Sequence, residues 1–137
     1  MILLLLALGC TGAVDDTGAP DSGTPPITEP RFTLDADVQP LMDEFCTEIC
    51  HQEPMAESNT FSLMPGETRS EIIDVPAVQV PVLDRVEPYQ PELSYLMHKL
   101  WGSHTEVGGM GLSMPRDSDM PIEAVSIFEA WIEDGAH

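Results

Sequence analysis

Two thiols and an imidazole lie within six residues of one another, at Cys46, Cys50 and His51. Thiolate and imidazole are soft metal ligands, and two neighbouring thiols also oxidise to a disulfide in an oxidising compartment. Residues four apart are neighbours on one face of a helix, so this spacing can present both sulfurs together. A zinc site would need further ligands, from His98, His104 or an acid. The segment therefore predicts a metal, cofactor or disulfide site.

The six residues C-x-x-x-C-H resemble the C-x-x-C-H motif that binds haem covalently. In that motif two thiols bond the vinyl groups of the porphyrin and the histidine binds its iron. The spacer here has three residues instead of two, and we expect a local bulge or an opened helical turn to absorb the additional one. The hexapeptide favours haem attachment, and a Cys46–Cys50 disulfide is the alternative.

The third cysteine, Cys10, follows an apolar run at residues 2–8 that is too short to span a bilayer but suits a signal-peptide core. Residues 6–10 (LALGC) resemble a bacterial lipobox, in which the signal is cut before the cysteine and its sulfur carries lipid. That resemblance implies a signal peptide over residues 1–9 and lipidation of Cys10. An ordinary secretory signal with an incidental cysteine is the alternative.

Residues 10–30 are expected to form a disordered linker between this anchor and a folded domain. Sixteen of the twenty residues from 11 to 30 are Gly, Pro, Ser, Thr, Asp or Glu. Such a composition buries too little apolar surface to offset the conformational entropy of folding. We therefore assign the fold to residues 31–137 alone.

The chain is strongly acidic, with 5 Lys and Arg against 24 Asp and Glu and a net charge of −19. This balance argues against nucleic-acid binding, because a phosphate backbone rewards basic patches. It argues equally against electrostatic attachment to anionic lipids. Motifs for a serine nucleophile, a phosphate-binding loop and a zinc-protease helix are all absent from the sequence, so we expect no enzyme of those classes.

Hydrophobic periodicity predicts a helix that leads directly into Cys46. Two aspartates precede it as candidate N-terminal caps, Asp35 and Asp37, and Pro40 is compatible only with a first turn. The apolar face of this helix lies at the spacing i, i+3, i+4 and i+7 and is made of Val38, Leu41, Met42 and Phe45.

Three further helices are expected, over residues 70–75, over residues 93–101 and from Pro121 to a stop at Gly135. Prolines and glycines make the intervening residues 76–91 and 102–120 long loops. His98 is expected to face solvent. The last helix should bury Ile122, Val125, Phe128, Trp131 and Ile132, and further core residues should be Phe45, Tyr95, Leu96 and Trp101.

The predicted fold is thus all-α, with three to four short helices, long loops and no strand. Long loops in a small domain usually need something to wrap around. A domain of this size builds a poor core unless a large apolar cofactor completes it. The pattern therefore agrees with the haem interpretation of residues 46–51.

Four segments resemble, in order, a family of bacterial envelope cytochrome c-like domains. They are residues 38–46 (VQPLMDEFC), residues 88–100 (PYQPELSYLMHKL), Met114-Pro115 and residues 130–136 (AWIEDGA). The resemblance covers residues 35–136, nearly the whole predicted domain. It implies a small cytochrome c-like fold wrapped around one haem c. By the same resemblance His51 is the proximal iron ligand, Met114 is the distal ligand, and Cys46 and Cys50 form the thioethers.

Met110 and Met120 share a loop with Met114 and are its rivals, and His104 could replace it as ligand. A thioether opposite an imidazole favours ferrous iron and raises the reduction potential. The resemblance therefore implies a one-electron carrier rather than an enzyme. It would be lipid-anchored in the cell envelope, facing the periplasm or the cell surface, with protein redox partners.

Two alternatives remain to this carrier. One is a haem-less envelope binding lipoprotein with a Cys46–Cys50 disulfide. The other is a small haem enzyme or gas sensor with an open distal position.

Overall fold

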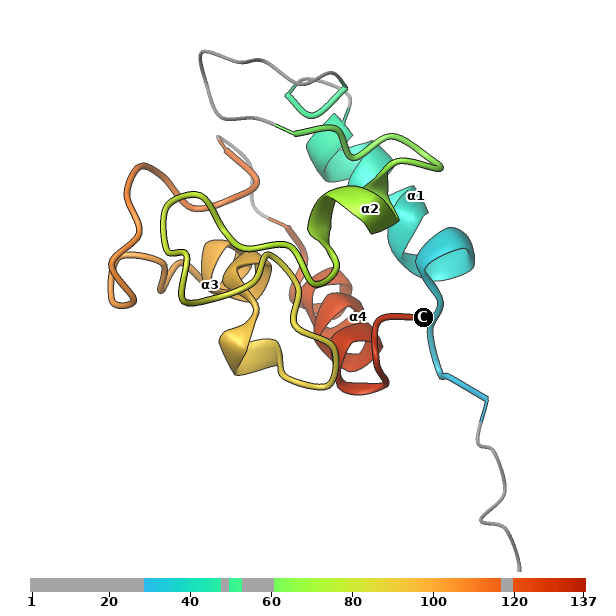
Figure 1. The fold of residues 1–137 in the computed structure, drawn as a ribbon. Helices are drawn as coiled ribbons and strands as arrows, with labels where there is room; N and C mark the ends of the chain where they lie inside the picture. Colours follow the sequence, from blue (N-terminus) through green and yellow to red (C-terminus); the bar gives the residue numbers. More distant parts are fainter. Residues whose placement is uncertain (1–28, 48–49, 53–60, 117–119) are drawn as a thin grey trace, which may run out of the picture.

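The computed structural model describes residues 29–47, 50–52, 61–116 and 120–137 (Figure 1). The expected signal peptide, the expected lipidation site Cys10 and nearly all of the expected linker lie outside these residues. No helix among the described residues is long and apolar enough to cross a bilayer.

The first helical run contains three elements without a break. A π-helix η1 (Leu34–Val38) leads into α1 (Gln39–Met42), which continues as a second π-helix η2 (Asp43–Thr47). The predicted helix before Cys46 is therefore confirmed, and Val38 and Met42 are completely buried. The expected cap was wrong. Thr33 is the N-cap, and its hydroxyl accepts from the N–H of Ala36. The predicted aspartates cannot be the N-cap because the helix already begins at Leu34, before both of them.

Asp37 completes this cap from inside the helix, since its carboxylate accepts from the Thr33 N–H at 2.7 Å. Two donors at the helix start are thereby satisfied reciprocally, in the manner of a capping box. Pro40 lies in the first turn of α1, but η1 precedes α1 without a break, so Pro40 is the seventh residue of the helical run and does not lie in its first turn as expected. Each π turn widens the helix by one residue, because its hydrogen bonds join residues five apart.

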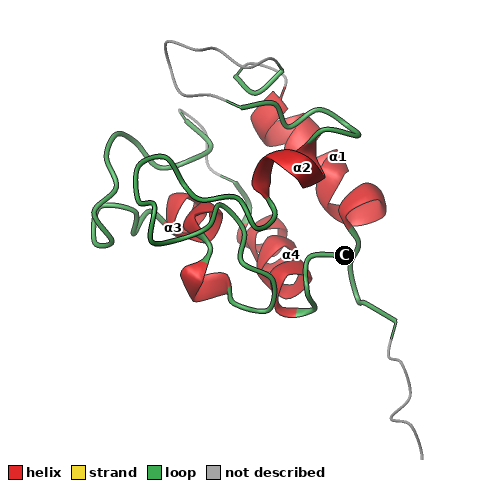
Figure 2. Cartoon of the chain, in the orientation of Figure 1, coloured by secondary structure: helices red, strands yellow, loops and turns green. Residues whose placement is uncertain are grey.

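Four shorter or later helices complete the fold: α2 (Thr68–Ile72), the 3₁₀ turn η3 (Pro91–Leu93), α3 (Tyr95–Trp101) and α4 (Ile122–Glu133). The predicted helix over 70–75 is displaced towards the N-terminus, because Ile73 is extended and pairs with Val86 as an isolated bridge. Gly102 ends α3 in the left-handed conformation that glycine adopts without strain. Residues 76–90 and the described part of 102–120 are loops, as expected (Figure 2).

No strand occurs in the described part of the chain, where β-pairing is limited to isolated bridges. The predicted all-α class is thus confirmed. The main core gathers apolar residues from the first helical run, α2, α3 and α4. Its buried members are Leu34, Val38, Met42, Leu63, Ile72, Val86, Met97, Val125, Phe128, Trp131, Ile132 and Ala136.

Two expected core residues are exposed instead. Ile122 is 69% exposed at the first position of α4, ahead of the turn that meets the core. Trp101 is 41% exposed at the last position of α3, where its ring meets His98 edge-on. Tyr95 is buried as expected but belongs to a second, smaller cluster with Ala77 and Val80.

The two ends of the described domain meet beside the last turn of α4. The carbonyl of His137 accepts from the N–H of Leu34 at 2.7 Å and from Nε1 of Trp131 at 3.0 Å. The guanidinium of Arg31 pairs with Asp134 at 3.2 Å. These contacts close the first helical run against α4.

Candidate functional site

Cys46 lies in η2 and packs, half-buried, against the main core. Burial raises the pKa of its thiol to about 12, and the nearby charges of Asp43 and Cys50 add to the effect. Cys50 is also half-buried, and both cysteines are free thiols in the structure. Residues 48 and 49, inside the predicted motif, lie outside the described residues.

The additional spacer residue coincides with π-helical geometry. Cys46 belongs to η2, and the N–H of His51 donates to the Cys46 carbonyl at 3.1 Å, five residues back. A bond over five residues is the π pattern, which accommodates one residue more than an α turn. This agrees with the expected opened turn.

The ring of His51 is oriented by the main chain of Phe61. Nδ1 lies 2.9 Å from the Phe61 carbonyl, and the two rings are tilted with centroids 5.0 Å apart. Because a carbonyl oxygen can only accept, Nδ1 must carry the proton in this contact. Nε2 then holds the lone pair, and no described residue hydrogen-bonds it. A neutral imidazole held in this tautomer is the usual form of a metal-ligating histidine.

Phe61 has no counterpart in the sequence prediction. Its ring lies under the guanidinium of Arg85, whose central carbon is 4.1 Å from the ring centroid. Arg85 is in turn held by the main-chain carbonyl of Glu71. Ten residues separate His51 from Phe61, and most of those between lie outside the described residues, so no periodic signal could have paired them.

Of the three candidate methionines, the structure brings Met114 and Met120 together and separates Met110. A cavity of about 200 Å³ is lined by Leu100, Trp101, Gly102, Ser113, Met114, Pro115 and Met120. Met110 does not line it, and its side chain is 68% exposed. The wall of this cavity does not include Cys46, Cys50 or His51. Cys46 and Met120 both pack against the main core.

His104 is buried, with 5% of its surface exposed. Its Nε2 lies 3.0 Å from the carbonyl of Gly111, while Nδ1 is buried with no partner among the described residues. His98 is half-buried rather than solvent-facing, because its two ring nitrogens contact the Ser103 hydroxyl and the Glu92 carbonyl. His104 therefore hydrogen-bonds within the loop after α3, and His98 contacts both that loop and η3.

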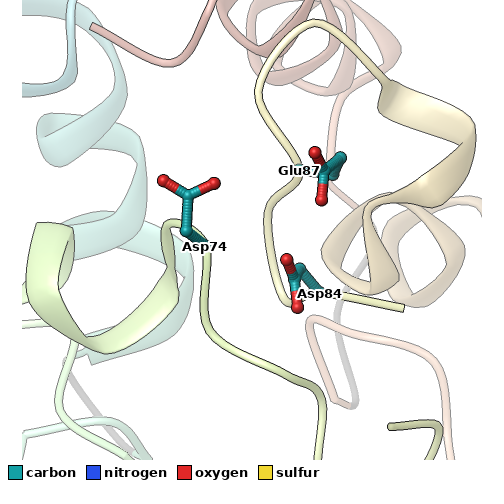
Figure 3. Close-up of side chains that lie close together, drawn as sticks. All are labelled: Asp74, Asp84 and Glu87. Atoms are coloured by element: carbon teal, nitrogen blue, oxygen red, sulfur yellow. The ribbon is translucent and has the colours of Figure 1, made fainter. Parts of the chain in front are cut away.

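A separate acidic cluster lies on the segment that joins α2 to η3. Carboxylate oxygens of Asp74, Asp84 and Glu87 lie there within 4.8 Å of one another (Figure 3). Hydrogen bonding to Asp84 raises the pKa of Glu87, with burial and the charges of Asp84 and Asp74 adding to it.

No family model matches the chain, and no curated protein or solved structure matches it either.

Proposed function

We propose that this protein is a monohaem c-type cytochrome that carries single electrons in the bacterial envelope. The observation that carries the proposal is the orientation of His51, whose Nδ1–H points at the Phe61 carbonyl at 2.9 Å. Nε2 makes no hydrogen bond to a described residue, and the neighbouring Cys46 and Cys50 in the sequence are free thiols. This contact is the one that metal-bound histidines commonly make through the ring nitrogen that does not bind the metal.

The donor set fits a covalently bound haem. Cys46 and Cys50 supply two thiols for thioether bonds, and His51 supplies Nε2 as proximal ligand. The Phe61 carbonyl accepts the other ring proton and so orients the imidazole, as the outer partners of metal-bound histidines do. When bound, haem c supplies one iron that cycles between ferric and ferrous states. The resemblance of residues 35–136 to cytochrome c-like domains is the second line of support.

Met114 is the favoured distal ligand. Its side chain is half-buried at the cavity beside α3, whereas Met110 is mostly in solvent. A thioether ligand stabilises ferrous iron and so raises the potential of a carrier. Met120 lines the same cavity and is the direct rival. We further propose that Cys10 is lipidated and that the linker tethers the domain to the envelope membrane, where it meets a redox partner protein.

Attachment is tested by expressing the full chain in a host that matures c-type haem, then recording the visible spectrum before and after extraction with acidified organic solvent. We expect the haem to remain with the denatured protein, since thioethers survive unfolding. Cys46→Ser and Cys50→Ser should each lower the yield of haem protein, and His51→Ala should abolish the low-spin spectrum. Haem that is freely extracted would overturn covalent attachment. A haem-less protein with a Cys46–Cys50 disulfide, identified by mass spectrometry, would establish the alternative lipoprotein.

The distal ligand is tested by carbon monoxide. Reduced wild type should be six-coordinate and slow to bind it, while Met114→Ala should open the position, lower the potential and bind it rapidly. Met110→Ala is the matched control in the same loop and should behave as wild type. Rapid binding only in Met120→Ala would transfer the ligand role to Met120. Rapid binding in the wild type would favour a sensor or enzyme over a carrier.

A further inference from the structure

Lys99 of α3 makes three hydrogen bonds to the loop that carries Met114, residues 103–116, and His98 adds one to Ser103. The ammonium of Lys99 donates to the carbonyls of Met110 at 2.8 Å and Leu112 at 3.0 Å. The main-chain carbonyl of the same lysine accepts from the N–H of Met114 at 3.0 Å. We propose that Lys99 is a positioning residue that holds the Met114 thioether in place, an inference that rests on the proposed function.

His104 secures the carbonyl between the two that Lys99 binds. Its Nε2 lies 3.0 Å from the carbonyl of Gly111 and must donate to it, because that oxygen can only accept. Three successive carbonyls, at residues 110, 111 and 112, are therefore bound alternately by an ammonium and an imidazole. The backbone two residues before Met114 has little freedom to shift.

The entry to this segment is fixed by contacts from α3 and from the loop at residue 79. Gln79 Oε1 accepts from the N–H of Met110 at 3.1 Å and from the hydroxyl of Tyr95. The Lys99 ammonium lies 5.6 Å from the centroid of the Tyr95 ring. Gly109 leaves room for this arrangement, since a Cβ there would stand 2.2 Å from the Tyr95 hydroxyl oxygen.

Lysine is suited to this task because its ammonium carries three donors and no acceptor, so it can serve two carbonyls at once. Hydrogen bonds from a charged donor are also stronger than neutral ones. Lys99 is the only lysine in a sequence with 24 acidic residues, and here both of its recorded hydrogen bonds go to main-chain carbonyls. Its role is therefore to hold the loop on α3 rather than to pair with a surface carboxylate.

The test compares Lys99→Met with wild type in the full chain, by two independent measurements. Amide hydrogen exchange reports the stability of residues 110–114, and we expect it to be about tenfold faster in the variant, because two charged hydrogen bonds are lost. In the haem-loaded protein, the absorption band of thioether-bound ferric iron should weaken and carbon monoxide uptake should quicken. Lys99→Arg keeps donors for both carbonyls and should restore most of both signals.

Arg31→Met is the matched control, since it removes one positive charge at the far end of α4 and should change neither signal. Unchanged exchange and an unchanged thioether band in Lys99→Met would overturn the proposal. Faster exchange with an unchanged band would also overturn it, because the loop would then be held without positioning Met114. A wild type that carries no haem would overturn the proposed function itself, and that result is read before any variant is made.

Discussion

The two sides of the proposed iron site are built in different ways. On the His51 side, the residues follow a continuous helical run, and the backbone itself supplies the supports: the Cys46 carbonyl for the His51 N–H and the Phe61 carbonyl for its ring. On the Met114 side there is no regular element, and side chains of α3 and the loop bind successive carbonyls instead. The first arrangement is local in sequence for all but Phe61, whereas the second joins α3 to a loop 11–15 residues away.

This difference implies that the two sides should respond differently to perturbation. A helix loses hydrogen bonds gradually from its ends, so damage to one turn is contained. A loop held by a few side chains loses its position when one support is removed. Four predictions use this contrast, and they begin with the core that both sides share.

Trp131→Ala should have the largest effect and should not distinguish the two sides. Trp131 is completely buried in α4, and its Nε1 donates to the His137 carbonyl. Removal of a buried tryptophan typically costs about 3–5 kcal/mol in the free energy of unfolding. Urea unfolding followed by circular dichroism should show that loss. Ile122→Ala is the control on the same helix, because Ile122 is 69% exposed and should be nearly neutral.

Cys46 should react slowly with iodoacetamide in the haem-free protein. Burial first, and then the Asp43 and Cys50 charges, raise the pKa of its thiol to about 12, so that little thiolate is present at pH 8. In a Cys10→Ser, Cys50→Ser variant, we expect alkylation of the folded chain to be roughly tenfold to a hundredfold slower than in urea, because little thiolate is present. The higher nucleophilicity of a more basic thiolate offsets part of this loss. Equal rates folded and unfolded would show that η2 does not protect this thiol.

Gly109→Ala should damage the Met114 side alone. The new Cβ would stand 2.2 Å from the Tyr95 hydroxyl oxygen and 2.7 Å from the His104 carbonyl, so the loop must shift. We expect a cost of about 1–3 kcal/mol, with faster amide exchange at residues 110–114 and unchanged exchange at His51. Ser113→Ala, an exposed change in the same loop, is the control. Faster exchange at His51 as well would mean that the two sides are one cooperative unit.

Thr33→Ala should have the smallest effect and should act only on the helical side. The Thr33 hydroxyl accepts from the Ala36 N–H at 3.3 Å, and loss of such a cap costs about 1 kcal/mol. The change should quicken amide exchange near η1 and leave residues 110–114 as they are. Asp35→Ala is the comparison at one of the two residues that the sequence favoured as caps. A larger effect from Asp35→Ala would contradict the observed capping.

The helical side was readily predicted from sequence, because periodicity reports which residues face a core. Val38 and Met42 are buried as the spacing requires, and α4 begins and ends almost where Pro121 and Gly135 indicate. The failures lie at helix ends, where periodicity carries no information. Ile122 belongs to the apolar stripe by spacing but precedes the turn that reaches the core, and Trp101 ends α3 at the surface.

The residues that hold the Met114 loop could not be predicted from the sequence. Lys99, His104 and Gln79 bind main-chain carbonyls or an N–H, and every residue offers those groups whatever its side chain. Sequence analysis therefore proposed Met114 as a ligand but could not predict which residues hold its loop. The same limit applies to Phe61, whose carbonyl rather than its ring orients His51.

The ion pair between Arg31 and Asp134 also bears on how the domain would be oriented relative to the membrane if the proposed linker tethers it there. Arg31 is pinned at the C-terminal end of α4, while Met120, in the wall of the Met114 cavity, lies just before the N-terminal end of the same helix. Twelve residues of α-helix separate these two points, a length of about 18 Å at 1.5 Å per residue. If the proposed linker does tether the domain from ahead of Arg31, the tether and the Met114 cavity lie at opposite ends of α4.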